Sequence, residues 1–389
     1  MQGLTKCRLV VLQSTPFCPF ECSYCYLPDR DDRRCMSERV LSAVAEQILH
    51  PQWADPVPSV VWHAGEPLAL RADWYDAAMS LIGSRTFPTV SPRWGLQTSG
   101  IGLDDAWLAL LRRWNIGIGL SLDGPADLHD ATRRTRGGKG TFGAAMRAVG
   151  RLREAEIPFH VITVLTRAHL GEADRLFDFY LEAGIRRVCF NVEEVEGAHR
   201  ASSLAFAGVE RAYRAFLERF LERWSACPDR IWVREFAEAI ALLATDERDG
   251  FNEQTEPLAA LSVAVDGGVS SFSPELLGLA SDRHGSFVFG NLLEEPFAVI
   301  AERIRSSEIA REIASGVAAC RASCSYFPLC GGGAPVNKLA EHGRLDATET
   351  LFCRLTRKVL FDVVLDALER GLRLTDEAVV ASDGQEVHL

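Results

Sequence analysis

The stretch STPFCPFECSYCYLPDR, residues 14–30, places three cysteines within eight residues, in the spacing C-x3-C-x2-C at Cys18, Cys22 and Cys25. It follows an apolar run at 8–13, RLVVLQ, that is typical of a buried β-strand. Three thiolates leave a tetrahedral zinc site one ligand short, but they can hold three corners of a 4Fe-4S cluster and leave the fourth iron open. An open iron can bind and activate a small molecule. A zinc loop completed by a distant fourth ligand is the alternative.

Six apolar runs alternate with amphipathic helical segments through the first half of the chain. This repetition predicts a parallel sheet with right-handed crossover helices, and six units are too few for a closed eight-stranded barrel. We therefore expect an α/β fold, a partial (β/α)6 TIM barrel, with its chemistry at the carboxyl ends of the strands. The expected strands are 8–13, 59–65, 93–100, 116–124, 159–166 and 186–194, and the expected helices are 37–50, 72–84, 104–114, 140–156 and 172–184.

The second half of the chain is first helical and then changes character. Helices are expected at 207–226 and 234–245, followed by a hairpin at 262–273 with an Asp-Gly-Gly turn. A cysteine-rich loop and a closing helix at 353–371 come next, and the polar tail after Leu372 is expected to be peripheral. The predicted domains are a barrel at 1–225, a helical bridge at 226–255 and a cysteine-rich domain at 256–389.

Composition excludes several classes of protein. With 47% hydrophobic and 24% charged residues, the 389-residue chain suits a packed core. A net charge of −11 opposes binding to nucleic acid or to an anionic membrane. No signal peptide or run of ~20 apolar residues is present, so we expect a cytoplasmic protein. Reduced cysteines are expected to bind metal, act in catalysis or be buried; burial is expected for the four outside any motif, Cys7, Cys35, Cys189 and Cys227.

Further motifs follow the later strands, and together with the cysteine triplet they resemble the radical S-adenosylmethionine (SAM) superfamily. They are WHAGEP at 62–67, QTSG at 97–100, SLDGP at 121–125 and HDATRRTRGGKGTF at 129–142. Each alone is weak, because a glycine-rich turn is usually only a turn. Their order and their agreement with the triplet carry the resemblance. One departure is Ala64, which stands where the family's GGEP motif has its first glycine.

The resemblance implies a 4Fe-4S cluster on the three cysteines, whose open iron chelates the amino and carboxylate groups of SAM. It implies that Gly65 and Glu66 receive the SAM ammonium, and that Arg133 pairs with the SAM carboxylate. QTSG and SLDGP are similar to the family's ribose and carboxylate contacts. His63 and His129 are open between metal ligands and hydrogen-bonding residues. The implied SAM-binding residues are Tyr24, Gly65, Glu66, Gln97, Ser99, Ser121, Asp123 and Arg133.

A second cysteine set lies near the carboxyl end, in ACRASCSYFPLCGGGAPVNK at 319–338 and ETLFCRL at 349–355. Four thiolates suit a fully ligated iron–sulfur cluster or a structural zinc site, and spacing does not separate the two. The layout resembles the SPASM extension of radical SAM peptide maturases, whose usual form has cysteines for two auxiliary clusters. Here the hairpin region 262–278 has no cysteine, so we expect one auxiliary 4Fe-4S cluster, on Cys320, Cys324, Cys330 and Cys353.

Four segments resemble the cyclophane-forming peptide maturases of the GrrM/OscB group: 190–204, 273–278, 287–296 and the cysteine-rich stretch 324–355. The resemblance implies a ribosomally made precursor peptide as substrate. It implies removal of a β-hydrogen and addition of that carbon to a nearby aromatic ring carbon, which closes a three-residue ring. An external electron donor of the flavodoxin or ferredoxin type is also implied.

Restoring the aromatic ring requires an electron acceptor and a base. The auxiliary cluster is the candidate acceptor. Glu275 is the favoured base, because SPELLG replaces the segment that would ligate an inner cluster; Glu193, Glu194 and Glu196 at the last strand end compete. The alternative for Glu275 is a helix-start carboxylate held by first-turn amides.

Three other functions remain open at this point. Formylglycine formation on sulfatases and thioether formation in a peptide are the nearest, although the missing inner cysteine set counts against sulfatase maturation. A noncatalytic metal-cluster binding module is a hypothesis of another class. SAM-site motifs at successive strand ends count against it.

Overall fold

One ten-stranded sheet organises the chain in the computed structural model, which describes residues 5–245 and 250–371. Its strand order is β12-β9-β8-β1-β2-β3-β4-β5-β6-β7. The six predicted strands pair in parallel in sequence order, which confirms the partial barrel. They are β1 (Cys7–Leu12), β2 (Ala54–Trp62), β3 (Arg93–Thr98), β4 (Gly117–Ser121), β5 (Phe159–Leu165) and β6 (Arg187–Val192).

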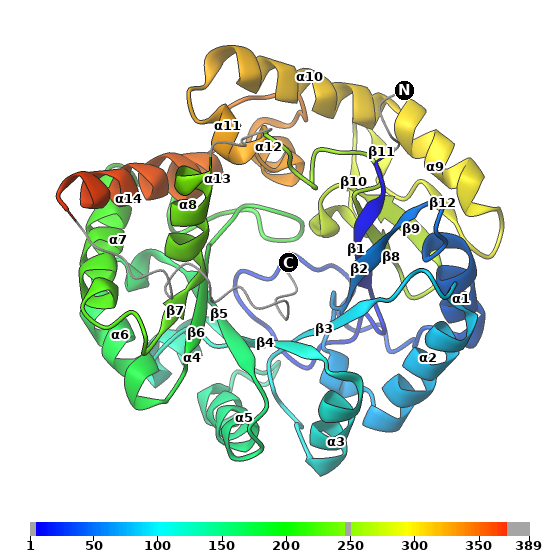
Figure 1. Cartoon of the computed structure of the whole chain (residues 1–389), viewed down its shortest axis with the longest axis horizontal. Coiled ribbons are helices and arrows are strands. Elements are labelled where there is room, and N and C mark those ends of the chain that lie inside the picture. Colours follow the sequence, from blue (N-terminus) through cyan, green and yellow to red (C-terminus); the bar gives the residue numbers. More distant parts are fainter. Residues whose placement is uncertain (1–4, 246–249, 372–389) are drawn as a thin grey trace.

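The predicted crossover helices form the outer layer around these strands (Figure 1). Helix α3 shows why the sequence forms them: Asp104 accepts a hydrogen bond from the backbone N–H of Trp107 at its start, and Asn115 ends it in a left-handed conformation. Its apolar side chains face the core, where strand and helix side chains pack together. The predicted helices are α1 (Glu38–Ala43) continued by the π-helical η1 (Val44–Ile48), α2 (Ala72–Arg85), α3 (Asp105–Trp114), α5 (Phe142–Glu154) and α6 (Ala173–Glu182). A short helix that was not predicted, α4 (Ala126–Thr132), follows β4.

The predicted hairpin forms, and it extends the barrel sheet. Strands β8 (Ala260–Val263) and β9 (Gly268–Ser271) are antiparallel, and β8 also pairs in parallel with β1. Strand β1 therefore lies between β2 and β8, with Val10 opposite both Val60 and Leu261. Strand β9 runs back toward the amino end of β1, and the segment after it then turns, so that a Cβ at Gly278 would lie 3.4 Å from Pro28 beside the cysteine loop. The division of the chain into domains at 225 and 255 stays a prediction.

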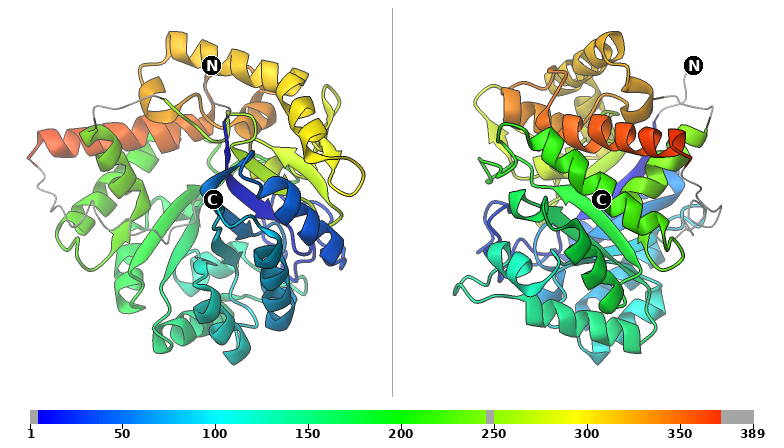
Figure 2. Two further views of the ribbon diagram at one scale, coloured as in Figure 1. Left: turned by 45° about the vertical axis from the view of Figure 1, so that its right-hand side comes forward. Right: turned by 90° about the vertical axis from the view of Figure 1, so that its left-hand side faces the viewer.

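Helices complete the carboxyl half. Both views of Figure 2 place α14 (Leu360–Glu369), drawn in red, against the earlier helices, and it contacts α7 (Val209–Ser225) and α8 (Arg234–Ala244). The predicted tail after Leu372 lies outside the described residues. The other elements are β7 (Trp232–Val233), β10 (Ala280–Ser281), β11 (Gly285–Ser286), β12 (Gly290–Asn291), α9 (Phe297–Ser306), α10 (Glu308–Ser323), α11 (Phe327–Cys330), α12 (Pro335–His342), α13 (Leu351–Cys353), η5 (Arg354–Val359) and the 3-10 turns η2 (Pro67–Ala69), η3 (Arg167–His169) and η4 (Pro274–Leu276).

The cysteines outside the motifs differ in burial. Cys7 and Cys189 are buried, as predicted, and Cys227 is half-buried against the core. The prediction was wrong for Cys35, which is exposed because the chain there runs along the surface just before α1. No helix in the described part of the chain is both long enough and apolar enough to cross a bilayer.

Candidate active site

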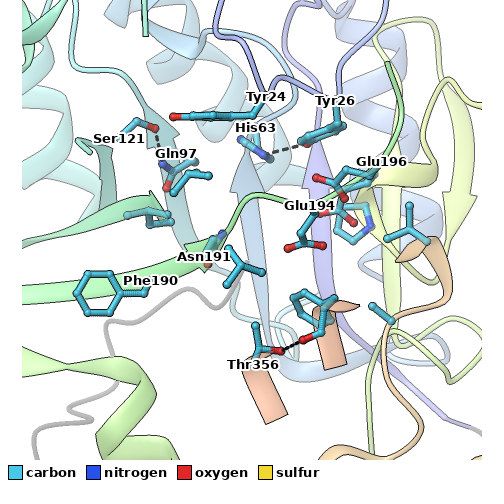
Figure 3. A pocket seen from close by; sticks show the side chains of 18 of the residues that line it. Tyr24, Tyr26, His63, Gln97, Ser121, Phe190, Asn191, Glu194, Glu196 and Thr356 are labelled. Atoms are coloured by element: carbon cyan, nitrogen blue, oxygen red, sulfur yellow. Dashed lines mark hydrogen bonds between the residues drawn. The ribbon is translucent and has the colours of Figure 1, made fainter. Parts of the chain in front are cut away.

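A cavity of about 550 Å³ opens at the carboxyl ends of the barrel strands. Its wall includes all three cysteines of the first motif, residues within or after β2 to β6, Glu275 after the hairpin, and residues of α12 and α14. Figure 3 shows part of this wall, with side chains from several strand ends pointing into one space. The cavity falls within the size range of pockets that enclose small-molecule ligands.

Backbone hydrogen bonds hold the cysteine loop against the segment 132–136. The N–H of Glu21 donates to the carbonyl of Arg134 at 2.7 Å, and the N–H of Ser23 donates to the carbonyl of Thr132 at 3.0 Å. The N–H of Cys25 donates to the carbonyl of Cys22 at 3.2 Å, which closes a turn between two of the thiols. The three cysteines therefore share a loop whose path is set by a partner more than 100 residues away in sequence.

The first-motif thiols lie within electrostatic reach of one another. Burial, the carboxylate of Glu66 and the two other thiols raise the pKa of Cys18 to about 12. Burial also raises the pKa of Cys22 to about 11, and Cys25 contributes. Metal binding requires thiolates. A positively charged metal group between the sulfurs would offset the cost of ionising these buried thiols. No three cysteine, histidine or carboxylate side chains of the described residues lie close enough to hold a single metal ion. The donor set of three thiols on one pocket wall fits a cluster held at three corners.

Asp123 holds Arg133 and Tyr24 in place. Its fully buried carboxylate accepts from the Tyr24 hydroxyl at 2.5 Å and from Arg133 Nε at 2.9 Å. The Arg133 guanidinium lies 5.2 Å from the Tyr24 ring centre. Burial opposes ionisation of Asp123, but Arg133 outweighs it and holds the pKa of this carboxyl below its usual value. Tyr24 and Arg133 line the cavity, whereas the Asp123 carboxylate is committed to these partners.

Gly65 and Glu66 form a rigid part of the wall. Gly65 has φ of 150°, and a Cβ there would stand 2.0 Å from the Thr15 carbonyl oxygen, so only glycine fits. The Glu66 carboxylate accepts from the Thr98 hydroxyl at 2.6 Å and from the Ser99 hydroxyl at 2.6 Å, in addition to two backbone N–H groups. These bonds join the 3-10 turn η2 to the end of β3. Ala64, the departure from the family motif, takes the left-handed conformation that a glycine would adopt with less strain.

Gln97 lines the cavity and has an unsatisfied acceptor. Its Nε2 donates to the Ser121 hydroxyl at 3.0 Å, and this bond is drawn in Figure 3. Its Oε1 is buried and has no hydrogen-bond partner among the described residues. A buried amide oxygen without a donor is costly, and a ligand hydroxyl such as that of a ribose would satisfy it. The Gln97, Ser99 and Ser121 positions implied by the resemblance therefore all lie on the wall, beside Glu66.

Three carboxylates meet on the opposite part of the wall. Burial raises the pKa of Glu194 to about 8, and burial together with Glu194 and Glu275 raises that of Glu196. Burial raises the pKa of Glu275, whose Oε2 has no hydrogen-bond partner in the described part of the chain. Figure 3 shows the Glu194 and Glu196 carboxylates close together on the side of Tyr26. A carboxylate whose pKa is raised in this way binds a proton more readily than an ordinary carboxylate.

Glu193 faces away from this cavity. Its carboxylate accepts from the backbone N–H of Ser203 at 2.8 Å and from the Ser203 hydroxyl, and it lies 3.4 Å from the imidazole of His199. It lines a separate hollow with Leu204 and Phe206. Glu193 thus anchors the 193–203 loop, while its neighbour Glu194 enters the cavity.

Sequence reasoning missed Tyr26 and Asn337. The Tyr26 hydroxyl hydrogen bonds to His63 Nε2 at 3.1 Å, and burial lowers the pKa of His63 to about 4, so its ring is neutral at pH 7. His129 hydrogen bonds to the N–H of Asp123 and to the Thr141 hydroxyl. Both histidines are therefore hydrogen-bonding residues in this structure. Asn337 donates to Glu194, and no local signal in its helix distinguishes it from a surface amide.

The four carboxyl-terminal cysteines also share one site. Burial raises the pKa of the Cys320 thiol, the Lys338 amine opposes that rise, and the thiols of Cys324, Cys330 and Cys353 add to it. The backbone N–H of Thr350 donates to the Cys353 sulfur at 3.4 Å. These four thiols act on one another electrostatically and are supplied by α10, α11, α13 and the turn after α10. They fit a fully ligated iron–sulfur cluster, which spans more space than a single metal ion.

Comparison with known proteins agrees with this geometry. The family model of the radical SAM superfamily matches residues 12–180, the span from the end of β1 to α6. The chain belongs to the radical SAM superfamily. Enzymes of this superfamily use SAM with a 4Fe-4S cluster, and the loop of Cys18, Cys22 and Cys25 with the adjoining Gln97 acceptor fits that pair of cofactors.

Two relatives cover most of the chain. A Synechocystis sp. protein, "Uncharacterized protein sll1766", is 37% identical over 376 residues, which cover 94% of this chain and 93% of the relative. The cysteine-type anaerobic sulfatase-maturating enzyme of Clostridium perfringens (strain 13 / Type A) is 21% identical over 339 residues, 84% of this chain and 88% of that enzyme. The similarity therefore extends through both halves of this radical SAM enzyme.

Two solved structures share the fold. The structure titled "Native anSMEcpe with bound AdoMet" has a TM-score of 0.73 at 20% identity and covers 93% of this chain and 98% of its own. Streptococcus suis SuiB bound to precursor peptide SuiA has a TM-score of 0.65 at 16% identity, covering 90% of this chain and 76% of its own. At this identity they establish the fold alone, a partial barrel followed by a carboxyl-terminal extension.

Proposed function

We propose that this radical SAM enzyme modifies a ribosomally made precursor peptide, joining an aromatic ring carbon to the β-carbon of a nearby residue in a three-residue cyclophane. The observation that carries the proposal is the position of Glu275. It follows a hairpin without cysteines and enters the cavity lined by Cys18, Cys22 and Cys25, with an oxygen that lacks a partner among the described residues. A carboxylate in the same cavity as the cluster cysteines can accept the last proton of a ring-forming oxidation.

Residues of the cavity would hold the cofactors and the substrate. Cys18, Cys22 and Cys25 would hold the cluster, and Gly65, Gln97 and Arg133, with the other wall residues named above, would hold SAM. When bound, these cofactors supply a 5′-deoxyadenosyl radical that removes a hydrogen atom from an unactivated carbon. The wall beyond them, between Glu275 and the Glu194–Asn337 pair, is left for the peptide. Streptococcus suis SuiB, which shares this fold, binds the precursor peptide SuiA, and this supports a peptide as the substrate here.

Glu275 would act as the base. Forming the new C–C bond at an aromatic carbon leaves that carbon with one hydrogen too many, and aromaticity returns when the hydrogen leaves as a proton. Burial raises the pKa of Glu275, which makes its carboxylate a better proton acceptor. Glu194 and Glu196 lie on the same part of the wall and are the competing candidates.

The balance of the reaction also requires a one-electron acceptor. The product lacks two hydrogens: one leaves as an atom that ends in 5′-deoxyadenosine, and the other leaves as a proton together with one electron. Cys320, Cys324, Cys330 and Cys353 would hold the single auxiliary cluster, the candidate acceptor for that electron. A flavodoxin or ferredoxin would supply the electron that starts the cycle.

Formylglycine formation is the second candidate, because a sulfatase-maturating enzyme is similar over most of the chain. It would use the same cavity and base, and would also need an electron acceptor. The hairpin without cysteines favours the cyclophane, since this chain offers one auxiliary cysteine set. Thioether formation requires a cysteine in the peptide. Superfamily membership argues against a noncatalytic module.

The test is an anaerobic reaction of the reconstituted enzyme with SAM, a reductant and a precursor peptide encoded beside its gene. Cyclophane, thioether and serine-derived formylglycine all make the peptide lighter by two hydrogens, so mass alone does not separate them. A hydrazide reagent reports an aldehyde, and tandem mass spectrometry reports a ring by the missing fragments inside it. A peptide with its aromatic residue replaced by leucine is the matched control.

The expected result is 5′-deoxyadenosine together with a hydrazide-negative peptide that does not fragment across three residues beginning at the aromatic ring. The leucine peptide should form no ring. A hydrazide-positive product would favour sulfatase-type chemistry, and a ring that persists in the leucine peptide but needs a cysteine would favour a thioether. Deuterium at the β-carbon should appear in 5′-deoxyadenosine if hydrogen removal occurs there.

A further inference from the structure

Helix α12 connects the cavity with the second cysteine site through two consecutive residues. Asn337 donates to the Glu194 carboxylate at 2.5 Å, and the Lys338 amine donates to the Cys320 sulfur at 3.8 Å. Adjacent residues on a helix point about 100° apart, so one short helix can direct its side chains to two different sites. The Asn337 contact belongs to the cavity already described. The Lys338 contact lies outside that cavity, at the second cysteine site.

Lys338 is a buried cation without a carboxylate partner in the described structure. Its exposed fraction is 2%. Among residues 5–245 and 250–371 it forms no ion pair with an aspartate or glutamate, and its hydrogen bond is to Cys320. The absence of a side chain at Gly316 leaves room for the amine, since a Cβ there would stand 3.1 Å from Lys338 Nζ. Burying an ammonium without an opposite charge is costly, so a compensating negative charge is expected nearby.

The acidic groups that act most strongly on Lys338 are cysteines. Cys320, Cys330 and Cys353 all act electrostatically on its amine. Neutral thiols do not compensate a positive charge, but metal-bound cysteines are thiolates and do. Lys338 therefore fits a loaded four-thiolate site better than an empty one.

We propose that Lys338 is a positioning residue for the auxiliary iron–sulfur cluster, whose charged hydrogen bond to the Cys320 thiolate stabilises the reduced form of that cluster. Adding one electron makes the cluster and its four thiolates more negative by one charge. A fixed positive charge in a poorly solvated site favours the more negative state, and hydrogen bonds to cluster sulfurs act in the same direction. Lys338 thus makes the cluster a better electron acceptor.

Lys358 provides a matched comparison. It also acts electrostatically on Cys324 and Cys353, but its side chain is 31% exposed and it pairs with Glu349. Solvent and the glutamate screen its charge, so its effect on the cluster should be small. We therefore expect Lys338 and Lys358 to have unequal effects on the reduction potential of the auxiliary cluster.

The test uses the full chain with Cys18, Cys22 and Cys25 changed to alanine, so that the auxiliary cluster alone contributes to the spectrum. After anaerobic reconstitution, iron and sulfide are quantified and the midpoint potential is measured by a mediated redox titration followed by electron paramagnetic resonance. Lys338→Met should shift the potential to a more negative value. Lys338→Arg, which keeps the charge, should shift it less, and Lys358→Met should leave it nearly unchanged.

An unchanged potential in Lys338→Met with full cluster content would overturn the proposal, as would a site that takes up zinc in place of iron. If the methionine variant loses the cluster, Lys338→Gln decides, because glutamine keeps an N–H donor and removes the charge. An unshifted potential in Lys338→Gln would also overturn the proposal. The inference rests on the auxiliary cluster and not on the bond formed in the peptide, so a sulfatase-type or thioether product would leave it intact.

Discussion

Asn337 on α12 donates a hydrogen bond across 2.5 Å to the carboxylate of Glu194, which follows β6. The bond joins the carboxyl-terminal region to the barrel wall inside the cavity. It also opposes the effect of burial on Glu194, whose pKa nevertheless rises to about 8. The cavity therefore contains a carboxyl group that is largely protonated at neutral pH.

The first prediction concerns pH and Glu194. Because the pKa of Glu194 is higher in the folded protein than the usual 4.5, the folded state binds this proton more tightly, and its stability falls as pH rises from about 4.5 to about 8. Glu194→Gln should flatten that fall, which calorimetric melting temperatures between pH 5 and pH 9 would show. Glu369→Gln, at an exposed position on α14, is the control and should follow the wild-type curve. Parallel curves for Glu194→Gln and wild type would contradict the prediction.

The second prediction concerns Glu275. Glu275→Gln should still form 5′-deoxyadenosine but lose modified peptide by about 100-fold or more, since a positioned base contributes about 10²–10⁴-fold. Liquid chromatography with mass spectrometry of nucleoside and peptide from one reaction measures both. Glu194→Gln and Glu196→Gln in the same assay test the competing carboxylates. Full ring formation by Glu275→Gln would remove this residue as the base.

The third prediction concerns Asp123. Asp123→Asn removes the negative charge of the pair and leaves the mostly buried Arg133 without its carboxylate, which should lower the free energy of unfolding by about 3–5 kcal/mol. SAM affinity, measured by equilibrium dialysis, should fall as well because Arg133 loses its fixed position. Asp127→Asn breaks an exposed pair with Arg175 and should change little. Equal losses of unfolding free energy in the two variants would contradict the prediction, because burial would then add nothing to the Asp123–Arg133 pair.

The fourth prediction concerns Gly65. Gly65→Ala places a methyl group 2.0 Å from the Thr15 carbonyl oxygen and in an unfavourable backbone conformation, so it should shift the wall, weaken SAM binding and lower the melting temperature. Gly83→Ala, within α2, meets nothing within 4 Å and should stabilise the protein by up to about 1 kcal/mol. Thermal melts and SAM dialysis on both variants provide the comparison. Unchanged SAM binding in Gly65→Ala would show that the wall tolerates the shift.

The sequence alone determined the barrel and indicated the two groups of cysteines. Strand and helix types follow from local periodicity, which survives without tertiary information, and the six parallel strands formed in the predicted order. The triplet of Cys18, Cys22 and Cys25 lies on one short loop, so its convergence is almost a local property. The four carboxyl-terminal cysteines all fall within residues 320–353, so their grouping could also be read from the sequence.

The tertiary structure decided which side chains enter the cavity. Glu193 and Glu194 are adjacent in an extended segment, where neighbouring side chains point to opposite sides, and only packing selects the side that faces the cavity. Asp123, Asn337 and Lys338 acquired their roles from partners that lie 10 to 143 residues away in the chain. The pairing of β8 with β1 likewise joins segments about 250 residues apart. Local periodicity has no information about such partners, because they depend on how the loops and helices close over the barrel.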